Sequence, residues 1–331
     1  MILPAIILSI CFLILTALEA AYLPIARRKG WTTAHNVRED GHPVTVVGAG
    51  FIFYVAMILW SFSASIFYNV DAPGSYFLLG LTMLAATSFA DDVMGLKVWV
   101  RLAVQLIAVL FLCFEFPVFT TDFWLVLLFI FCVIGFINAY NFMDGINGMT
   151  GSYSIVALCS FLCINNFMGM HFTSGTYIIY ALMGAVIFTF CNFRRRAIAF
   201  AGDVGSISMG YIVAVLLAQF ILYVGDASPI VLVAVYTTDT LATVIRRLIE
   251  GENIFTGHRK HIYEQLHFNR RVSQLKISSI YSLLQLCISC GYLMTLRISP
   301  ETSRFYTLAV YSLLVLLYIC MLIPLSRKRA E

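Results

Sequence analysis

Residues 122–142 read DFWLVLLFIFCVIGFINAYNF, an almost uninterrupted apolar stretch that ends among asparagines. A helix needs about 20 predominantly apolar residues to cross the hydrocarbon core of a bilayer. We therefore expect this stretch to be a transmembrane helix whose last turn carries polar groups. The composition extends this expectation to the whole chain, because 61% of its 331 residues are hydrophobic and only 11% are charged. A soluble globule would need more polar surface than these residues supply.

Similar apolar runs recur along the chain, separated by short polar breaks, and give about eleven expected spans. Their approximate ranges are 2–25, 46–69, 74–91, 98–117, 122–142, 150–168, 175–193, 206–225, 228–247, 277–297 and 303–325. The first run lacks a basic segment and a small-residue cleavage site, so we expect it to be retained and not removed as a signal. The predicted fold class is an all-α polytopic membrane protein, with residues 1–331 forming one transmembrane domain.

The basic residues predict an orientation, since short cytoplasmic loops are enriched in Lys and Arg. With the N-terminus outside and the C-terminus in the cytosol, all 21 Lys and Arg residues except Arg297 and Arg304 fall on the cytosolic side. A net charge of +4 then needs no nucleic-acid partner, because an anionic cytoplasmic leaflet accounts for it. The expected surroundings are the lipid bilayer.

Polar residues gather at the cytosolic ends of the expected helices. A transporter would more often place ionisable groups near the bilayer midplane, at broken helices in two related halves, and we find no such repeat. The distribution favours an active site at the cytosolic membrane surface.

Asp91 and Asp92 are adjacent carboxylates at the end of the third expected span, and Lys97 follows them. Mutual repulsion raises the pKa of one carboxylate or recruits a cation, which suits proton transfer or metal-phosphate chemistry. The alternative is an ordinary helix end with solvated charges. Asp91 and Asp92 are thus candidate catalytic residues, and Lys97 is a candidate substrate-binding residue.

A second motif surrounds the end of the fifth span, where steps of three place Asn138, Asn141, Asp144 and Asn147 along one drifting face if the helix continues. Such a polar stripe at the lip of a membrane helix predicts a hydrated cleft. Glycines follow at 145, 148 and 151, where they break the helix and permit close approach of a ligand. A plain interhelical hydrogen-bond ladder is the alternative.

The third motif is Phe200-Ala-Gly-Asp203-Val-Gly-Ser206, at the start of the eighth span. Glycine, a carboxylate and a serine at a helix start suit a metal ion and phosphate oxygens. As an isolated residue, Asp203 would be read equally well as a helix N-cap.

The fourth motif runs from Asp239 and Arg246, which share a helix face, to His258-Arg259-Lys260-His261. This dense basic loop suits the anionic groups of phosphoryl transfer. A positive-inside anchor would explain the Arg and Lys residues but not the histidines.

In this order, the four motifs resemble the polyprenyl-phosphate N-acetylhexosamine-1-phosphate transferase family over roughly residues 36–266. The resemblance implies transfer of N-acetylhexosamine-1-phosphate from a UDP-sugar to undecaprenyl phosphate, with release of UMP, as the initiating step of a cell-surface glycan. It also implies Mg²⁺, or Mn²⁺ in its place, and a site on the cytosolic face of the bacterial inner membrane. A homodimer is left open.

The resemblance also assigns roles to the carboxylates. Asp91 and Asp92 correspond to the family's paired aspartates near the lipid phosphate, and Asn141 and Asp144 match its Asn-x-x-Asp-Gly motif. Asp203 matches the Mg²⁺ ligand. We therefore expect the carboxylates at these helix ends to converge around one divalent cation.

Four further residues follow from the same resemblance. Phe200 matches an aromatic that stacks on uracil, and His258 and His261 correspond to the family's cytosolic histidine motif, with Arg259 between them as a substrate-binding residue. Asn147 departs from the family, which commonly has aspartate there, so aspartate at 147 should be tolerated. The histidine loop is closer to those of O-antigen and capsule initiators.

Two functions of other classes remain open from the residues alone. A polyprenyl-phosphate or nucleotide-sugar transporter would move substrate without producing UMP, and a catalytically silent homologue would bind without reacting. The donor sugar cannot be read from a motif, because it depends on pocket shape.

Overall fold

The computed structural model describes residues 2–33, 45–68, 74–116, 122–253 and 258–326. These ranges are helical, and the only strand-like pairing in them is two isolated backbone bridges. The elements are α1 (Ile2–Lys29), α2 (Phe51–Tyr68), α3 (Ser75–Met94), α4 (Val98–Glu115), α5 (Phe123–Phe142), α6 (Met149–Leu162), η3 (Cys163–Phe167), α7 (Gly175–Asn192), α8 (Gly202–Val224), η4 (Ser228–Val233), α9 (Ala234–Ile249), α10 (Ile262–Phe268), α11 (Gln274–Leu296) and α12 (Pro300–Ser326).

Within the described ranges, nine helical segments are long and apolar enough to cross a membrane: α1, α3, α4, α5, α7, α8, η4 with α9, α11 and α12. Helix α2 is a shorter apolar helix, and α6 continues into the π-helical turn η3. Each predicted run overlaps one of these helices or helix pairs, which confirms an all-α polytopic membrane protein. The number of crossings and their direction stay predictions.

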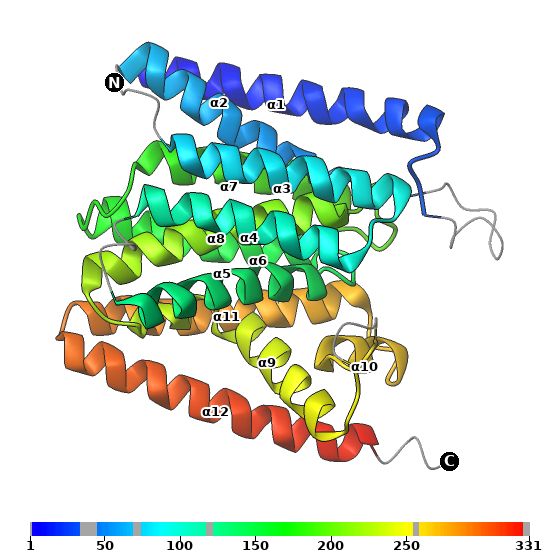
Figure 1. Ribbon diagram of the computed structural model, residues 1–331, viewed down its shortest axis with the longest axis vertical. Helices are drawn as coiled ribbons and strands as arrows, with labels where there is room; N and C mark the ends of the chain where they lie inside the picture. Colours follow the sequence, from blue (N-terminus) through cyan, green and yellow to red (C-terminus); the bar gives the residue numbers. More distant parts are fainter. Residues whose placement is uncertain (1, 34–44, 69–73, 117–121, 254–257, 327–331) are drawn as a thin grey trace.

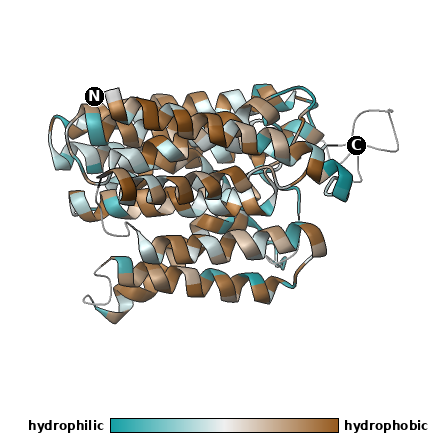
Figure 2. Cartoon of the chain, turned by 90° about the horizontal axis from the view of Figure 1, so that it is seen from above, coloured by the Kyte–Doolittle hydropathy of each residue, from teal (hydrophilic) through white to brown (hydrophobic). Residues whose placement is uncertain are grey.

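Hydrophobic residues, coloured brown, dominate along the helices, while hydrophilic residues, coloured teal, gather at helix ends and in loops (Figure 2). The helices lie side by side, with α1 and α12 along opposite edges (Figure 1). Helix α8 occupies the interior and packs against α2, α3 and α5. Its residues are buried almost without a break from Val204 to Phe220, because neighbouring helices surround it on every face.

The segment before α2 lies against the segment before α8. Val46 accepts a backbone hydrogen bond from Phe200 at 2.8 Å and donates one to Ile198 at 3.2 Å. One turn further, Gly50 and Gly205 bring the backbones of the two segments into contact, so a Cβ at either position would collide with the other glycine. Residues 45–50 are thereby fixed beside the start of α8.

Successive helices alternate in direction, so the ends of α3, α5 and α9 and the start of α8 meet at one end of the bundle. Helix α10 lies at this same end (Figure 1). All four sequence motifs are therefore brought to one end of the molecule, as predicted, whereas the assignment of that end to the cytosol stays a prediction.

Candidate active site

A cavity of about 280 Å³ opens at the end of the bundle where the motifs meet. It is lined by Thr33, Val47, Asp92, Asn141, Asp144, Gly145, Ile146, Asn147, Asn192, Phe200, Gly202, Asp203 and Gln274. Six of these are predicted site residues: Asp92, Asn141, Asp144, Asn147, Phe200 and Asp203. Carboxylates from separate helix ends thus line one cavity, but among the described residues no three of them are placed to surround one divalent cation as we expected. Their chemical roles stay predictions.

Asp92 caps the first turn of α8 from a distant helix. Its carboxylate accepts hydrogen bonds from the backbone N–H groups of Asp203, at 2.8 Å, and Val204, at 3.1 Å. These N–H groups have no partner within α8, because the first turn of any helix leaves its amides free. Gly202, with φ of +69°, sits so close to Asp92 that a Cβ would strike the carboxylate. The helix dipole and the two amides favour negative charge on Asp92, whereas its burial opposes that charge more strongly.

Asp203 is bound on both carboxylate oxygens. Asn141 donates to Oδ1 at 2.8 Å, and the Arg101 guanidinium contacts Oδ2 at 3.1 Å. Arg101 also contacts Asp91 Oδ2 at 2.8 Å, so one cation bridges two acidic motifs. Sequence reasoning counted Arg101 only as a sign of topology. Its position, one turn into the helix that follows the aspartate pair, could have indicated a contact with those aspartates.

Asp144 lies beyond the end of α5, which stops at Phe142, as the predicted span does. The helix therefore does not continue, and the condition for one helical face through Asp144 and Asn147 is not met. The turn after the helix nevertheless returns both side chains to the cavity. Thr150 donates to Asp144 Oδ1 at 2.5 Å. Burial raises the pKa of Asp144 to about 7 against the effect of this hydrogen bond, with a further contribution from the negative charges of Asp203 and Asp92.

Asn138, from the same stripe, is not part of the site. Its side-chain amide donates to Gln105 on α4 at 2.7 Å and accepts from it at 3.3 Å. For this residue the alternative holds: it forms an interhelical hydrogen bond that satisfies two polar groups inside a membrane bundle.

Asn147 is 6% exposed and connects three segments. Its side-chain amide donates to the Arg194 carbonyl at 3.0 Å, its backbone N–H donates to Gln274 Oε1 at 2.9 Å, and its carbonyl accepts from Ser278 at 2.7 Å. A carboxylate cannot donate to the Arg194 carbonyl and would face its oxygen. The hydrogen bond therefore reverses our expectation that aspartate would be tolerated at 147.

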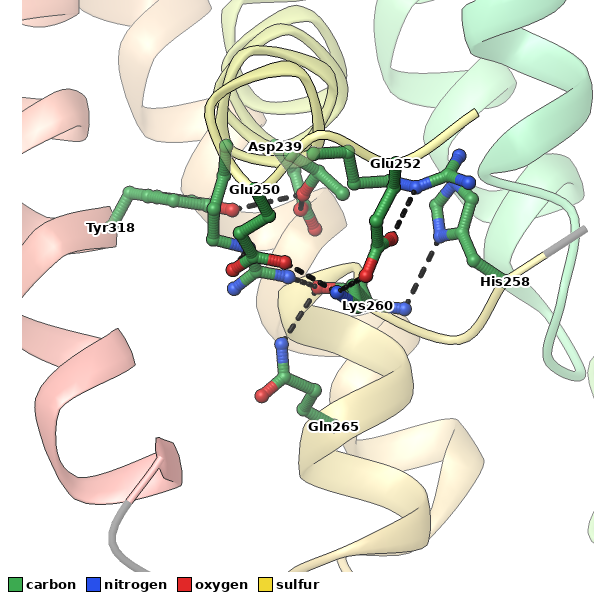
Figure 3. Close-up of polar contacts among 10 residues, drawn as sticks. Asp239, Glu250, Glu252, His258, Lys260, Gln265 and Tyr318 are labelled. Atoms are coloured by element: carbon green, nitrogen blue, oxygen red, sulfur yellow. Dashed lines mark hydrogen bonds and ion pairs between the residues drawn. The ribbon is translucent and has the colours of Figure 1, made fainter. Parts of the chain in front are cut away.

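The loop at 258–261 is less cationic than its sequence suggests. Lys260 forms ion pairs with Glu250 and Glu252, and its carbonyl accepts from Arg246 at 2.7 Å (Figure 3). Burial lowers the pKa of His258 to about 4, with help from the nearby positive charges, so this ring is neutral at pH 7. Glu250 and Glu252 thus neutralise the positive charge of Lys260.

The remaining predicted residues lie outside the cavity wall. The His261 ring is 2% exposed and stands 3.4 Å from the buried Asp239 carboxylate. Arg259 stacks over the Phe268 ring at 4.6 Å, and Lys97 is an exposed residue that precedes α4. The predicted roles of these residues in substrate binding or catalysis have no support from contacts with the cavity.

The sequence of this chain is also similar to those of known proteins. Residues 75–221 match the sequence profile described as glycosyl transferase family 4. This range of the chain is thus similar to glycosyl transferase family 4. The matched range holds the carboxylates Asp91, Asp92, Asp144 and Asp203, and it ends before α9 and α10.

The chain is also similar to proteins of several bacteria. The chain is 26% identical over 209 residues to a probable undecaprenyl-phosphate N-acetylglucosaminyl 1-phosphate transferase of Bacillus subtilis (strain 168), covering 57% of this chain and 56% of the relative. It is 30% identical over 166 residues to a phospho-N-acetylmuramoyl-pentapeptide-transferase of Carboxydothermus hydrogenoformans, covering 47% of each. An undecaprenyl-phosphate alpha-N-acetylglucosaminyl 1-phosphate transferase of Escherichia coli O157:H7 is 28% identical over 201 residues, with 57% of this chain and 53% of the relative covered. The chain thus spans about half the length of these relatives.

The donor atoms of this cavity suit a Mg²⁺ ion. In the described part of the chain, no three His, Cys, Asp or Glu side chains are placed to hold one ion together. Mg²⁺ commonly takes one or two carboxylates, completing its shell with water and substrate phosphates. Asp203, with the carboxylate of Asp92 and the amide of Asn141 beside it, fits that smaller set. Arg101 would have to leave Asp203 Oδ2 for that oxygen to become a ligand.

Proposed function

We propose that this chain transfers N-acetylhexosamine-1-phosphate from a UDP-sugar to undecaprenyl phosphate at the cytosolic face of the bacterial inner membrane, as the first step of a surface glycan. The observation that carries the proposal is the meeting of Asp92, Asp144 and Asp203 in one cavity at one end of a membrane helix bundle. The activities named for the similar proteins of Bacillus subtilis and Escherichia coli support the same reaction class.

The proposed reaction joins two polyanions. An oxygen of the lipid phosphate attacks the β-phosphorus of the UDP-sugar, the bond from that phosphorus to the bridging oxygen breaks, and UMP leaves with the bridging oxygen. The product is an undecaprenyl-diphosphate sugar. The second pKa of a phosphate monoester is about 6, so the nucleophile is largely ionised at neutral pH and a strong base is not essential.

The residues of the cavity have separate roles in the proposed reaction. Asp203 would hold Mg²⁺, which when bound neutralises the phosphate charges and lowers their repulsion. Asn141 orients Asp203 through the 2.8 Å hydrogen bond, and Arg101 offers a second positive charge beside the acidic groups. Asp92 holds the start of α8, and therefore Asp203, in place.

A UMP-release assay tests the proposal. Purified protein in detergent is incubated with undecaprenyl phosphate, Mg²⁺ and a panel of UDP-N-acetylhexosamines, and both UMP and lipid-linked sugar are measured. Asp203→Ala should abolish both. The matched control is Asp226→Ala, because Asp226 follows the far end of α8 and pairs there with Arg304.

The outcomes separate the three candidate functions. UMP and lipid-linked sugar from the wild type, lost in Asp203→Ala and kept in Asp226→Ala, support the transferase. Transport of substrate by reconstituted protein without UMP would indicate a transporter. Binding of nucleotide with neither product would indicate a catalytically silent homologue.

A further inference from the structure

The cavity carboxylate Asp144 belongs to no regular element. Helix α5 ends at Phe142, and α6 begins at Met149. Thr150 fixes one carboxylate oxygen of Asp144, but a hydrogen bond to the side chain does not fix the backbone that carries it. Hydrogen bonds of Asn147 and Gly148 hold the far end of the turn, so the question is what holds the backbone next to Asp144.

The hydroxyl of Tyr263 provides this contact. It donates to the Phe142 carbonyl at 2.7 Å, at the last residue of α5, and the Gly145 amide faces the same oxygen. A single oxygen atom therefore touches the backbone on both sides of Asp144. At Gly145 the approach is so close that a Cβ would collide with the hydroxyl. Tyr263 is 1% exposed, so these contacts are shielded from bulk solvent.

The position of Tyr263 is fixed in turn by a buried carboxylate on α9. Asp239 accepts from the Ile262 N–H at 3.1 Å, at the start of α10, and from the Tyr281 hydroxyl at 2.7 Å. The His261 ring lies against the same carboxylate. Asp239 thus joins α9, α10 and α11, and α10 carries the tyrosine that reaches the turn after α5.

We propose that Tyr263 is a positioning residue for the transfer reaction: its hydroxyl holds the backbone on both sides of Asp144 and so sets where that carboxylate stands in the cavity. This inference rests on the proposed function. Helix α10 then has a role in the site, although the histidine motif that precedes it does not line the cavity.

Tyr263→Phe removes the hydroxyl and leaves the ring. The kcat for UMP release should fall by about ten- to a hundredfold, since small misplacement of a reacting group has effects of this size. The KM for undecaprenyl phosphate should stay within about twofold, because the cavity wall is otherwise kept. The matched control is Tyr211→Phe, which removes an equally buried hydroxyl that donates to the Ala108 carbonyl at 3.1 Å, inside the bundle.

Hydrogen exchange supplies a readout independent of activity. The peptide covering residues 142–148 should exchange faster in Tyr263→Phe than in the wild type and should be unchanged in Tyr211→Phe. A second variant, Gly145→Ala, should lose activity through the collision with Tyr263, and its effect should be non-additive with Tyr263→Phe.

Equal kcat losses in the two tyrosine variants, or unchanged exchange at 142–148, would overturn the inference. If the wild type releases no UMP, the proposed function fails while the exchange result still decides whether Tyr263 holds the turn.

Discussion

Replacing Arg101 by glutamine should destabilise the fold and, at the same time, tighten Mg²⁺ binding. The guanidinium contacts Asp91 at 2.8 Å and Asp203 at 3.1 Å, and 26% of its side chain is exposed. Exposed ion pairs contribute about 0–1 kcal/mol, and breaking a buried pair costs about 3–5 kcal/mol. The intermediate exposure of Arg101 places the expected loss of stability near 2 kcal/mol.

The effect on the proposed Mg²⁺ ion should have the opposite sign, because Arg101 would compete with it for Asp203 Oδ2. A charge-assisted hydrogen bond contributes about 1.5 kcal/mol. Its removal should therefore lower the Mg²⁺ concentration at half-saturation by about tenfold.

Two measurements check the pair of effects: the melting temperature of the purified protein in detergent, and a Mn²⁺ titration followed by electron paramagnetic resonance. Arg196→Gln is the control, since Arg196 is an exposed basic residue at the same end of the bundle. A half-saturation that is unchanged or higher in Arg101→Gln would refute the idea that the guanidinium and the metal share Asp203.

Three further predictions concern the cavity wall. Asp92→Asn should severely reduce UMP release, because an amide has one acceptor oxygen for the two N–H groups of α8 that the carboxylate now binds; activity near that of wild type would contradict this. Asn147→Asp should destabilise the protein by about 1–3 kcal/mol through the lost hydrogen bond to Arg194, whereas melting at the wild-type temperature would restore our original expectation. The raised pKa of Asp144 means that the folded state favours its protonated form, so its contribution to stability is complete below its usual pKa of 3.8 and is lost as the pH rises through about 7. Asp144→Asn should remove this loss, as melting curves at pH 5.5 and 8.5 would show.

The helices and the meeting of the acidic motifs could be predicted from the sequence for a simple reason. Apolar runs of bilayer length define the helices, and alternation of direction puts every second helix end on one side. Asp92, Asp144 and Asp203 each stand at such an end, so topology alone brings them to one side of the molecule. Packing of the helices then brings Asp92 and Asp203 into direct contact, as the hydrogen bond from the Asp203 backbone N–H to Asp92 shows.

Other parts of the site depend on contacts that no local pattern encodes. Asn138 and Asn141 are one helical turn apart and look alike in sequence, yet one binds Gln105 and the other binds Asp203. Arg101 resembled the other basic residues at cytosolic helix ends. Gln274 gave no signal because a glutamine at a helix start is ordinary, and its place in the wall is set by the packing of α11 on α6.

The residues of the cavity wall come from distant parts of the chain. Val47 reaches it through the backbone pairing of residues 45–50 with the segment before α8, and Gln274 arrives from the start of α11, so both lie outside the 75–221 range shared with the family. A chimera that keeps residues 75–221 and takes its flanks from a relative would retain the acidic groups in a reshaped pocket. The donor sugar that such chimeras prefer should be the one preferred by the relative that supplies the flanking segments.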